Sequence, residues 1–267
     1  MILSLDLGGT RLRTAATLAD GRWLPCPAVM RPAGLTPATI VAHLQGALAE
    51  LPPEPVAAIG VSVAGLVDGE GTVQRAENLG WHDVPLGRKL AEAFGCPVKL
   101  ETDVFCGAGY EARQGDGQGA VCALYVAVGT GIGHAFILGG RVWRGAHGNA
   151  SALGHVVLDR AGRDCYCGNA GCLCTLASGR AWHEGADPAA SLPALAQAIG
   201  AAATLLEPDL VILSGGALSQ PWFDLAGLQA LLPRFAYPGL RLPRVVRSSV
   251  EDPNLRGAAL LAEEARQ

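Results

Sequence analysis

The chain has 267 residues, of which 50% are hydrophobic and 16% are charged, so it can build one large core or two modest ones. Its net charge is −4 and its basic residues are scattered, so the sequence shows no basic segment that would bind nucleic acid or an anionic membrane. We identify no signal peptide, and no apolar stretch that approaches the ~20 residues needed to span a bilayer. These features predict a soluble, cytoplasmic protein.

The first half of the chain predicts alternating strands and helices. A strand at residues 2–6 runs into the turn Gly8-Gly9-Thr10, and a return strand follows at residues 11–18. The pattern then predicts helices at 36–51, 86–94 and 104–113, and strands at 56–63 and 98–101.

The same pattern begins again at Val121. A strand at 124–128, the turn Gly129-Thr130-Gly131 and a return strand at 134–138 repeat the first unit about 120 residues later. The repeat predicts two related lobes, each offering a glycine turn to the cleft between them. A helix at 192–206, a strand at 210–213 and a helix at 254–264 complete the expected elements.

Each glycine turn has a composition that suits a phosphate. Glycines let the backbone approach a phosphate and aim N–H groups at it, and Thr10 or Thr130 can add a hydroxyl donor. Asp6, at the end of the first strand, is suited to hold Mg²⁺ through water. A plain Gly-Gly hairpin with a surface aspartate is the alternative for either turn alone. Repetition in one frame favours phosphate binding.

A third glycine pair, Gly215-Gly216, follows the strand at 210–213 and suits close packing against an adenine ring or its ribose. The sequence has no Walker-type Gly-Lys-Ser/Thr motif, so we do not expect a P-loop enzyme.

Several segments resemble the sugar kinases of the ROK family, in the same order over nearly the whole chain. They are Asp6-Leu-Gly-Gly-Thr10, Glu77-Asn-Leu-Gly-Trp81, Glu101-Thr-Asp103, Gly129-Thr-Gly-Ile-Gly133, Gly154-His155, the Cys-x-Cys-Gly-x-x-Gly-Cys-Leu loop and Ser178-Gly179. The resemblance implies an α/β, actin-like ATPase fold of two lobes. It also implies ATP with Mg²⁺, phosphorylation of a sugar hydroxyl, and a homodimer.

On this basis the lobes are expected at residues 1–103 with 250–267, and at residues 104–249, the second carrying a zinc loop at 155–174. The resemblance assigns ATP and Mg²⁺ to Asp6, Gly8, Gly9, Thr10, Gly129, Thr130, Gly131, Gly215 and Gly216. It assigns the sugar to Gly65, Asn78, Thr102, Asp103 and His155.

Asp103 is the candidate catalytic base. It lies between a predicted strand and a predicted helix, where the helix dipole favours a carboxylate that can accept a proton from a hydroxyl. A helix cap is the alternative role. The resemblance favours the base, because Asp103 falls on the catalytic aspartate of the family.

A cluster of one histidine and three cysteines predicts a structural zinc site. His155, Cys165, Cys167 and Cys172 supply four ligands in eighteen residues, the set that closed tetrahedral zinc prefers. An all-thiolate site that uses Cys174 in place of His155 is the second possibility. In the resembling family, zinc at these positions supports the sugar pocket, and the histidine also lies beside the sugar.

The sugar half of the pattern is altered in this chain. The family usually has glutamates, which hold sugar hydroxyls, where this sequence has Ala152 and Cys174, and it has Asn where this sequence has Thr102. The family's Pro-Gly turn is Ala64-Gly65 here, and only about 35 residues separate Ser178-Gly179 from Ser214-Gly215-Gly216. We therefore expect an ATP-dependent carbohydrate kinase whose acceptor is not plain glucose. The alternative is a non-catalytic relative that binds a nucleotide or another ligand in a regulatory role.

Overall fold

The computed structural model describes residues 1–266, which form two compact units. The N-terminal unit consists of Met1–Tyr110 and the chain from Asp252 onward, and the C-terminal unit is Glu111–Glu251. The division falls inside helix α3 (Asp103–Gln114), whereas the boundary expected from the sequence lies between Asp103 and Val104. Both units combine helices with mixed sheets, as the α/β prediction requires.

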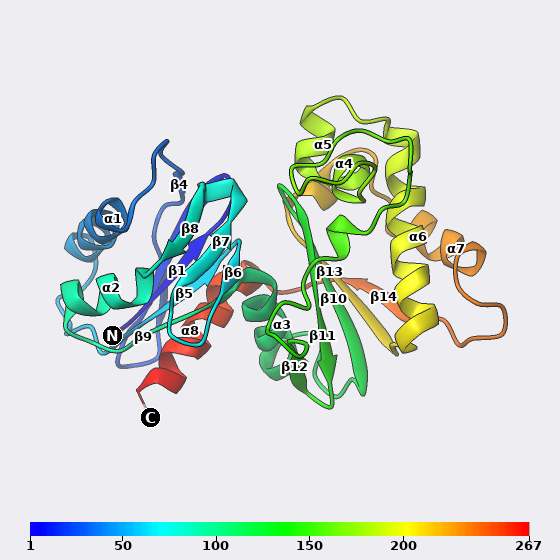
Figure 1. Cartoon of the computed structure of the whole chain (residues 1–267). Helices are drawn as coiled ribbons and strands as arrows, with labels where there is room; N and C mark the ends of the chain where they lie inside the picture. Colours follow the sequence, from blue (N-terminus) through cyan, green and yellow to red (C-terminus); the bar gives the residue numbers. More distant parts are fainter. Residues whose placement is uncertain (267) are drawn as a thin grey trace. The chain divides into compact units, whose positions relative to one another are not determined.

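The N-terminal unit is built on a sheet with the order β3-β2-β1-β5-β9, in which β4 also pairs with β2 (Figure 1). A separate three-stranded sheet, β6-β7-β8, was not predicted from the sequence. The elements of the unit are β1 (Ile2–Leu7), β2 (Arg11–Thr17), β3 (Trp23–Pro25), β4 (Val29–Met30), α1 (Pro37–Ala49), β5 (Ala58–Val63), β6 (Leu66–Val67), β7 (Val73–Ala76), η1 (Glu77–Leu79), β8 (Trp81–Val84), α2 (Leu86–Phe94), β9 (Val98–Thr102) and α8 (Pro253–Ala265).

Strand β1 is buried on both faces, and each face has its own partners. Leu3, Leu5 and Leu7 alternate along one face and belong to the core that includes residues of α1 and α2. Ile2, on the opposite face, packs with Ala262 of α8. Because side chains alternate along a strand, Asp6 lies on the α8 face.

Helix α8 packs closely on the sheet because the strand beneath it carries a glycine. A Cβ added to Gly60 of β5 would lie 1.7 Å from the carbonyl oxygen of Ala258, so only a residue without a side chain fits there. The helix contacts β1, β5 and β9 together, and it therefore holds the three parallel strands of this sheet in register.

The C-terminal unit repeats this plan with the order β12-β11-β10-β13-β14. In each unit an antiparallel hairpin comes first, and its first strand pairs in parallel with a later buried strand: β1 with β5, and β10 with β13. The predicted duplication of a strand–glycine turn–strand core is thus present. The elements of the unit are β10 (Cys122–Val128), β11 (Ile132–Leu138), β12 (Arg141–Trp143), η2 (Leu153–His155), α4 (Cys174–Ala177), α5 (Gly179–His183), α6 (Pro188–Leu206), β13 (Leu210–Ser214), η3 (Gly216–Ser219), α7 (Leu225–Leu231), η4 (Leu232–Arg234) and β14 (Arg244–Arg247).

Helix α6 corrects one expectation from the sequence. Its 19 residues are long and apolar enough to cross a membrane by length and composition, although no such stretch was expected. Half of its most apolar window is buried, and residues such as Leu195 and Ile199 lie in the core of the C-terminal unit with Val211 of β13. The core of the unit therefore accounts for its apolar composition.

We predict that Gly60→Ala destabilises the protein by about 1–3 kcal/mol or more, because the new methyl group would overlap the α8 backbone. Gly46→Ala is the matched control, since a Cβ on Gly46 in the middle of α1 meets nothing within 4 Å. It should raise stability slightly, as alanine usually does in a helix. Thermal denaturation of both variants checks the prediction, and equal melting temperatures would contradict it.

Candidate functional site

Asp6 is a buried carboxylate at the end of β1, and it is only 2% exposed. The hydroxyl of Ser62 donates to Asp6 Oδ1 at 2.7 Å, and Arg13 Nη1 donates to Asp6 Oδ2 at 2.9 Å. Burial raises the pKa of Asp6, and these two partners oppose the rise. Each oxygen keeps the capacity to accept a further hydrogen bond.

The first glycine turn, Gly8-Gly9-Thr10, joins β1 to β2 next to this carboxylate. A hydrogen bond from the Gly8 N–H to the Arg11 carbonyl oxygen, at 3.1 Å, closes it. Arg31, which follows β4, binds the turn twice: its N–H donates to the Thr10 carbonyl oxygen, and its Nε donates to the Gly9 carbonyl oxygen, both at 2.9 Å. Because their carbonyl oxygens are bound, Gly9 and Thr10 are held in one backbone conformation.

Asp103 is the first residue of α3, directly after β9. The Val104 N–H donates to Asp103 Oδ1 at 2.8 Å, which is a bond to the next residue, whereas a helix N-cap accepts from the second or third residue beyond it. Burial, followed by repulsion from Asp6, raises the pKa of Asp103 to about 7. A carboxyl group with that pKa is suited to general base catalysis near neutral pH.

The three other predicted sugar residues of the N-terminal unit have different surroundings. Thr102 is 4% exposed, and its hydroxyl donates to the Gly65 carbonyl oxygen at 2.9 Å. The hydroxyl hydrogen of Thr102 therefore already has an acceptor within the protein. Gly65 is tightly packed, since an added Cβ would lie 2.6 Å from Arg75 O, and Asn78 lies in the short helix η1.

The second turn, Gly129-Thr130-Gly131, joins β10 to β11 in the C-terminal unit. The Gly129 N–H donates to the Gly131 carbonyl oxygen at 2.9 Å. Two N–H groups at the start of α5 then bind the turn: Gly179 donates to the Gly129 carbonyl oxygen at 2.8 Å, and Arg180 donates to the Thr130 carbonyl oxygen at 3.2 Å. The first turn of α5 therefore fixes this glycine turn.

The third glycine pair is explained in part by packing. Gly215 has φ +106°, and an added Cβ would lie 2.4 Å from the Val128 carbonyl oxygen of β10. The protein backbone, and not a bound ring, therefore already requires glycine at this position. A Cβ on Gly216 would meet nothing within 4 Å, so this residue is open to a ligand.

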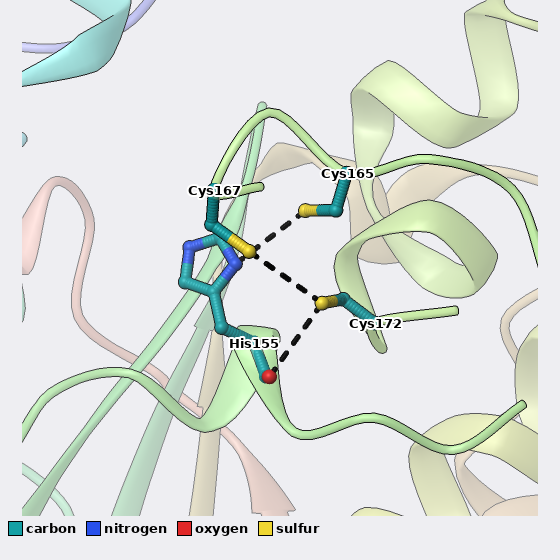
Figure 2. A group of neighbouring side chains, drawn as sticks. All are labelled: His155, Cys165, Cys167 and Cys172. Atoms are coloured by element: carbon teal, nitrogen blue, oxygen red, sulfur yellow. Dashed lines mark hydrogen bonds between the residues drawn. The ribbon is translucent and has the colours of Figure 1, made fainter. Parts of the chain in front are cut away.

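The cysteine loop gathers its four predicted ligands at one point (Figure 2). The ligand atoms of His155, Cys165, Cys167 and Cys172 all lie within 4.8 Å of one another. Cys167 Sγ and Cys172 Sγ are 3.7 Å apart, and Cys165 Sγ is 3.5 Å from His155 Nδ1. Burial lowers the pKa of His155, which favours the neutral imidazole that binds metal ions.

Two of these separations match those of tetrahedral zinc. Zn–S bonds of about 2.3 Å and Zn–N bonds of about 2.05 Å, at tetrahedral angles, put two sulfurs about 3.8 Å apart and a sulfur and a nitrogen about 3.6 Å apart. The pairs at 3.7 Å and 3.5 Å are close to these values, and the limit of 4.8 Å that holds for all four ligand atoms is wider.

Cys174 lies outside this group of ligands. The Cys174 Sγ accepts a hydrogen bond from the Ile132 N–H at 3.2 Å, and the residue is only 4% exposed. Gly154 makes room for it, since a Cβ there would lie 2.4 Å from Cys174 Sγ. Ala152, the other position without its expected glutamate, is exposed beside η2.

Five residues near these turns were not predicted from the sequence. Ser62 and Arg13 bind Asp6, and Arg31 binds the first glycine turn. Tyr166 and Arg180 adjoin the second glycine turn. Tyr166 could have been noticed from its place between two of the predicted metal ligands, Cys165 and Cys167. The other four have no signal in the sequence, because their roles depend on which strand or helix lies beside them.

We predict that Gly171→Ala disrupts the cysteine loop, because an added Cβ would lie 1.5 Å from the Asp159 carbonyl oxygen. Gly168→Ala is the matched control: both glycines have positive φ, but a Cβ on Gly168 meets nothing within 4 Å. Gly171→Ala should lower the melting temperature by several degrees more than the control. Similar melting temperatures for the two variants would contradict this account of the loop.

Comparison with known proteins identifies relatives over most of the chain. A family model described as "ROK family" matches residues 2–187. The glucokinase of Streptomyces coelicolor is 33% identical over 184 residues, which are 68% of this chain and 57% of that protein. The xylose repressor of Caldicellulosiruptor bescii is 36% identical over 130 residues, 48% of this chain and 33% of the repressor. The matched segments thus span about a third to just over a half of these curated relatives.

Solved structures give a match over the full chain. The ROK family glucokinase from Streptomyces griseus, in complex with glucose and AMPPNP, has a TM-score of 0.82 and 29% identity, and the match covers 98% of this chain and 99% of that one. The ROK hexokinase from Thermus thermophilus has a TM-score of 0.76 and 29% identity, covering 98% of each chain. The predicted fold class, that of ROK sugar kinases with their actin-like ATPase architecture, is therefore confirmed. The chain belongs to the ROK family.

Proposed function

We propose that this protein is an ATP-dependent carbohydrate kinase, which transfers the γ-phosphoryl group of ATP to a hydroxyl of a sugar. The observation that carries the proposal is the pair Asp6 and Asp103 at the carboxyl ends of β1 and β9, beside a glycine turn. In open α/β sheets, ligands bind beyond the carboxyl ends of the strands. The similarity to a glucokinase that holds glucose and AMPPNP supports the same function.

In this proposal Asp103 accepts the proton of the attacking hydroxyl. The turns Gly8-Gly9-Thr10 and Gly129-Thr130-Gly131 bind phosphates, and Gly216 lies near the nucleoside. Asp6 binds a water molecule of the nucleotide-bound Mg²⁺, whose charge offsets that of the phosphates. Phosphoryl transfer depends mainly on positioning and charge neutralisation, so one base with these groups is sufficient.

The acceptor is proposed to be a sugar with fewer hydroxyls to satisfy than glucose. A carboxylate is missing at Ala152 and Cys174, and the Thr102 hydroxyl is bound to the Gly65 carbonyl oxygen. Each lost hydrogen bond to a charged group costs about 1.5–3 kcal/mol, or about 10- to 100-fold in affinity. His155, Asn78 and Asp103 are the remaining sugar-binding candidates.

The histidine and the three cysteines are proposed to hold a structural zinc ion that fixes the loop at 155–174. Zinc bound by four protein ligands has no open coordination position, so its contribution is to folding and not to the reaction. Cys174, which is bound to the backbone of Ile132, is not needed for the site.

The alternative function is regulatory: the protein would bind a nucleotide or another ligand without catalysing a reaction. The missing glutamates favour it, and the similarity to xylose repressors shows that ROK proteins with another role resemble this chain. The same assay separates the two functions, because only a kinase releases ADP when a sugar is added.

We predict that ADP release by this protein is stimulated by at least one member of a panel of sugars and amino sugars, and that Asp103→Asn abolishes the stimulation. General base catalysis is typically worth about 10²–10⁴-fold in rate. Asp20→Asn is the control, because it removes an exposed carboxylate at a hairpin turn and should leave the rate unchanged. If no sugar stimulates turnover above the Asp103→Asn background, the kinase proposal is wrong and the binding protein is favoured.

We predict that kcat/KM rises with pH and levels off above pH 7. The base must be deprotonated to act, and the pKa of Asp103 is about 7, so roughly half of the molecules are active at that pH. An aspartate at its ordinary pKa, near 4, would give a flat profile across this range. The profile is measured with the best sugar, with ATP and Mg²⁺ saturating at each pH.

We predict that the purified protein contains about one equivalent of zinc by elemental analysis. Cys167→Ser and Cys172→Ser should each lose most of it, whereas Cys174→Ser should retain it. Loss of zinc in Cys174→Ser with retention in His155→Ala would instead indicate the all-thiolate site. Less than about half an equivalent in the wild-type protein would count against a zinc site altogether.

A further inference from the structure

Tyr166 lies between two of the cysteines proposed to hold zinc, and its ring contacts the side chains of His155 and Arg180 in the C-terminal unit. His155 meets its ring edge-on, with centroids 5.1 Å apart and planes at 86°. Arg180 has its Cζ 4.7 Å from the centroid of the same ring. A guanidinium held at this distance is attracted by the ring quadrupole, so Tyr166 restricts where the charge of Arg180 can lie.

The same ring reaches the second glycine turn. The Tyr166 hydroxyl oxygen lies 3.2 Å from the position that a Cβ on Gly131 would take. The backbone of Arg180 is itself bound to the turn, through its N–H and the Thr130 carbonyl oxygen at 3.2 Å. The phenol ring therefore contacts the guanidinium and also reaches the turn, to which the backbone of Arg180 is bound.

Two backbone N–H groups at this turn already have acceptors within the protein. The Gly129 N–H donates to the Gly131 carbonyl oxygen at 2.9 Å, and the Ile132 N–H donates to Cys174 Sγ at 3.2 Å. Neither N–H is available to a phosphate in this conformation. A phosphate chain carries several negative charges, so a nearby cation would add much to what the remaining donors provide.

We propose that Arg180 binds the phosphate chain of the nucleotide at the Gly129-Thr130-Gly131 turn, and that Tyr166 positions its guanidinium for this role. Stacking uses the face of a guanidinium, and its five N–H donors point outward along the edges, in a geometry that matches phosphate oxygens. The inference rests on the proposed function, in which this turn binds the phosphates of ATP.

The inference gives the cysteine loop a part in nucleotide binding. Tyr166 is flanked by Cys165 and Cys167, so ordering those two residues also orders the ring. Tyr166 is thus a positioning residue, which acts through Arg180 and need not touch the nucleotide.

Calorimetric titration with ATP, ADP and adenosine tests the inference. Arg180→Gln should weaken ATP and ADP binding by about tenfold or more, and should leave adenosine binding within about twofold. Arg160→Gln is the matched control, because Arg160 is exposed in the same unit and its substitution removes the same charge. Melting temperature and zinc content are measured for every variant, to show that the loop is intact.

The positioning role is tested with two changes at Tyr166. Tyr166→Phe keeps the ring and should bind ATP as the wild-type protein does. Tyr166→Leu should weaken ATP severalfold, and the double variant Tyr166→Leu/Arg180→Gln should bind no more weakly than Arg180→Gln, because the ring acts through the arginine.

Each outcome decides a different point. Equal ATP affinity in Arg180→Gln and Arg160→Gln overturns the inference while the proposed function stands. Equal loss of ATP and adenosine in Arg180→Gln also overturns it, because that is the sign of a structural role. Additive losses in the double variant overturn the positioning role of Tyr166. A wild-type protein that binds neither ATP nor ADP overturns the proposed function, and the inference with it.

Discussion

Both units depend on one constraint, the parallel pairing of a hairpin's first strand with a later buried strand. In the N-terminal unit this register sets Asp6 opposite Ser62, and it puts the glycine turn and Asp103 at the same edge of the sheet. In the C-terminal unit the same pairing puts Gly129-Thr130-Gly131 beside the Gly215-Gly216 pair. A one-residue slip would turn each of these side chains to the other face, so register and chemistry are fixed together.

The polar groups at these strand ends are held by the protein before any ligand arrives. Arg31 holds the first turn, and the first residues of α5 hold the second. Groups that are already oriented lose little freedom when a substrate binds, which is how phosphoryl transfer gains from positioning. The fixed turns contrast with two positions at which relatives were expected to hold a sugar, since here Cys174 and Thr102 are bound to the backbone of Ile132 and Gly65.

Much of the candidate site could be predicted because its residues are near one another in sequence. Asp6 with its turn, the Gly129 turn and the cysteine loop are short motifs in which spacing alone limits the geometry. Arg13, Ser62 and Arg180 could not be predicted, since each reaches its partner through strand pairing or through the packing of a distant loop. Gly215 was assigned to a ligand because the sequence cannot show that Val128 lies against it.

By itself the sequence determined the α/β class, the duplicated hairpin core and the set of one histidine and three cysteines that the fold brings together, because hydrophobic periodicity, glycine turns and cysteine spacing are local properties. Tertiary structure alone decided which donors remain for a ligand, which carboxyl groups have a raised pKa and which glycines are required by packing. Those properties depend on burial and on partners far away in the chain. For Asp103, burial and the neighbouring Asp6 turn a residue that looks like a helix cap into a candidate base with a pKa of about 7.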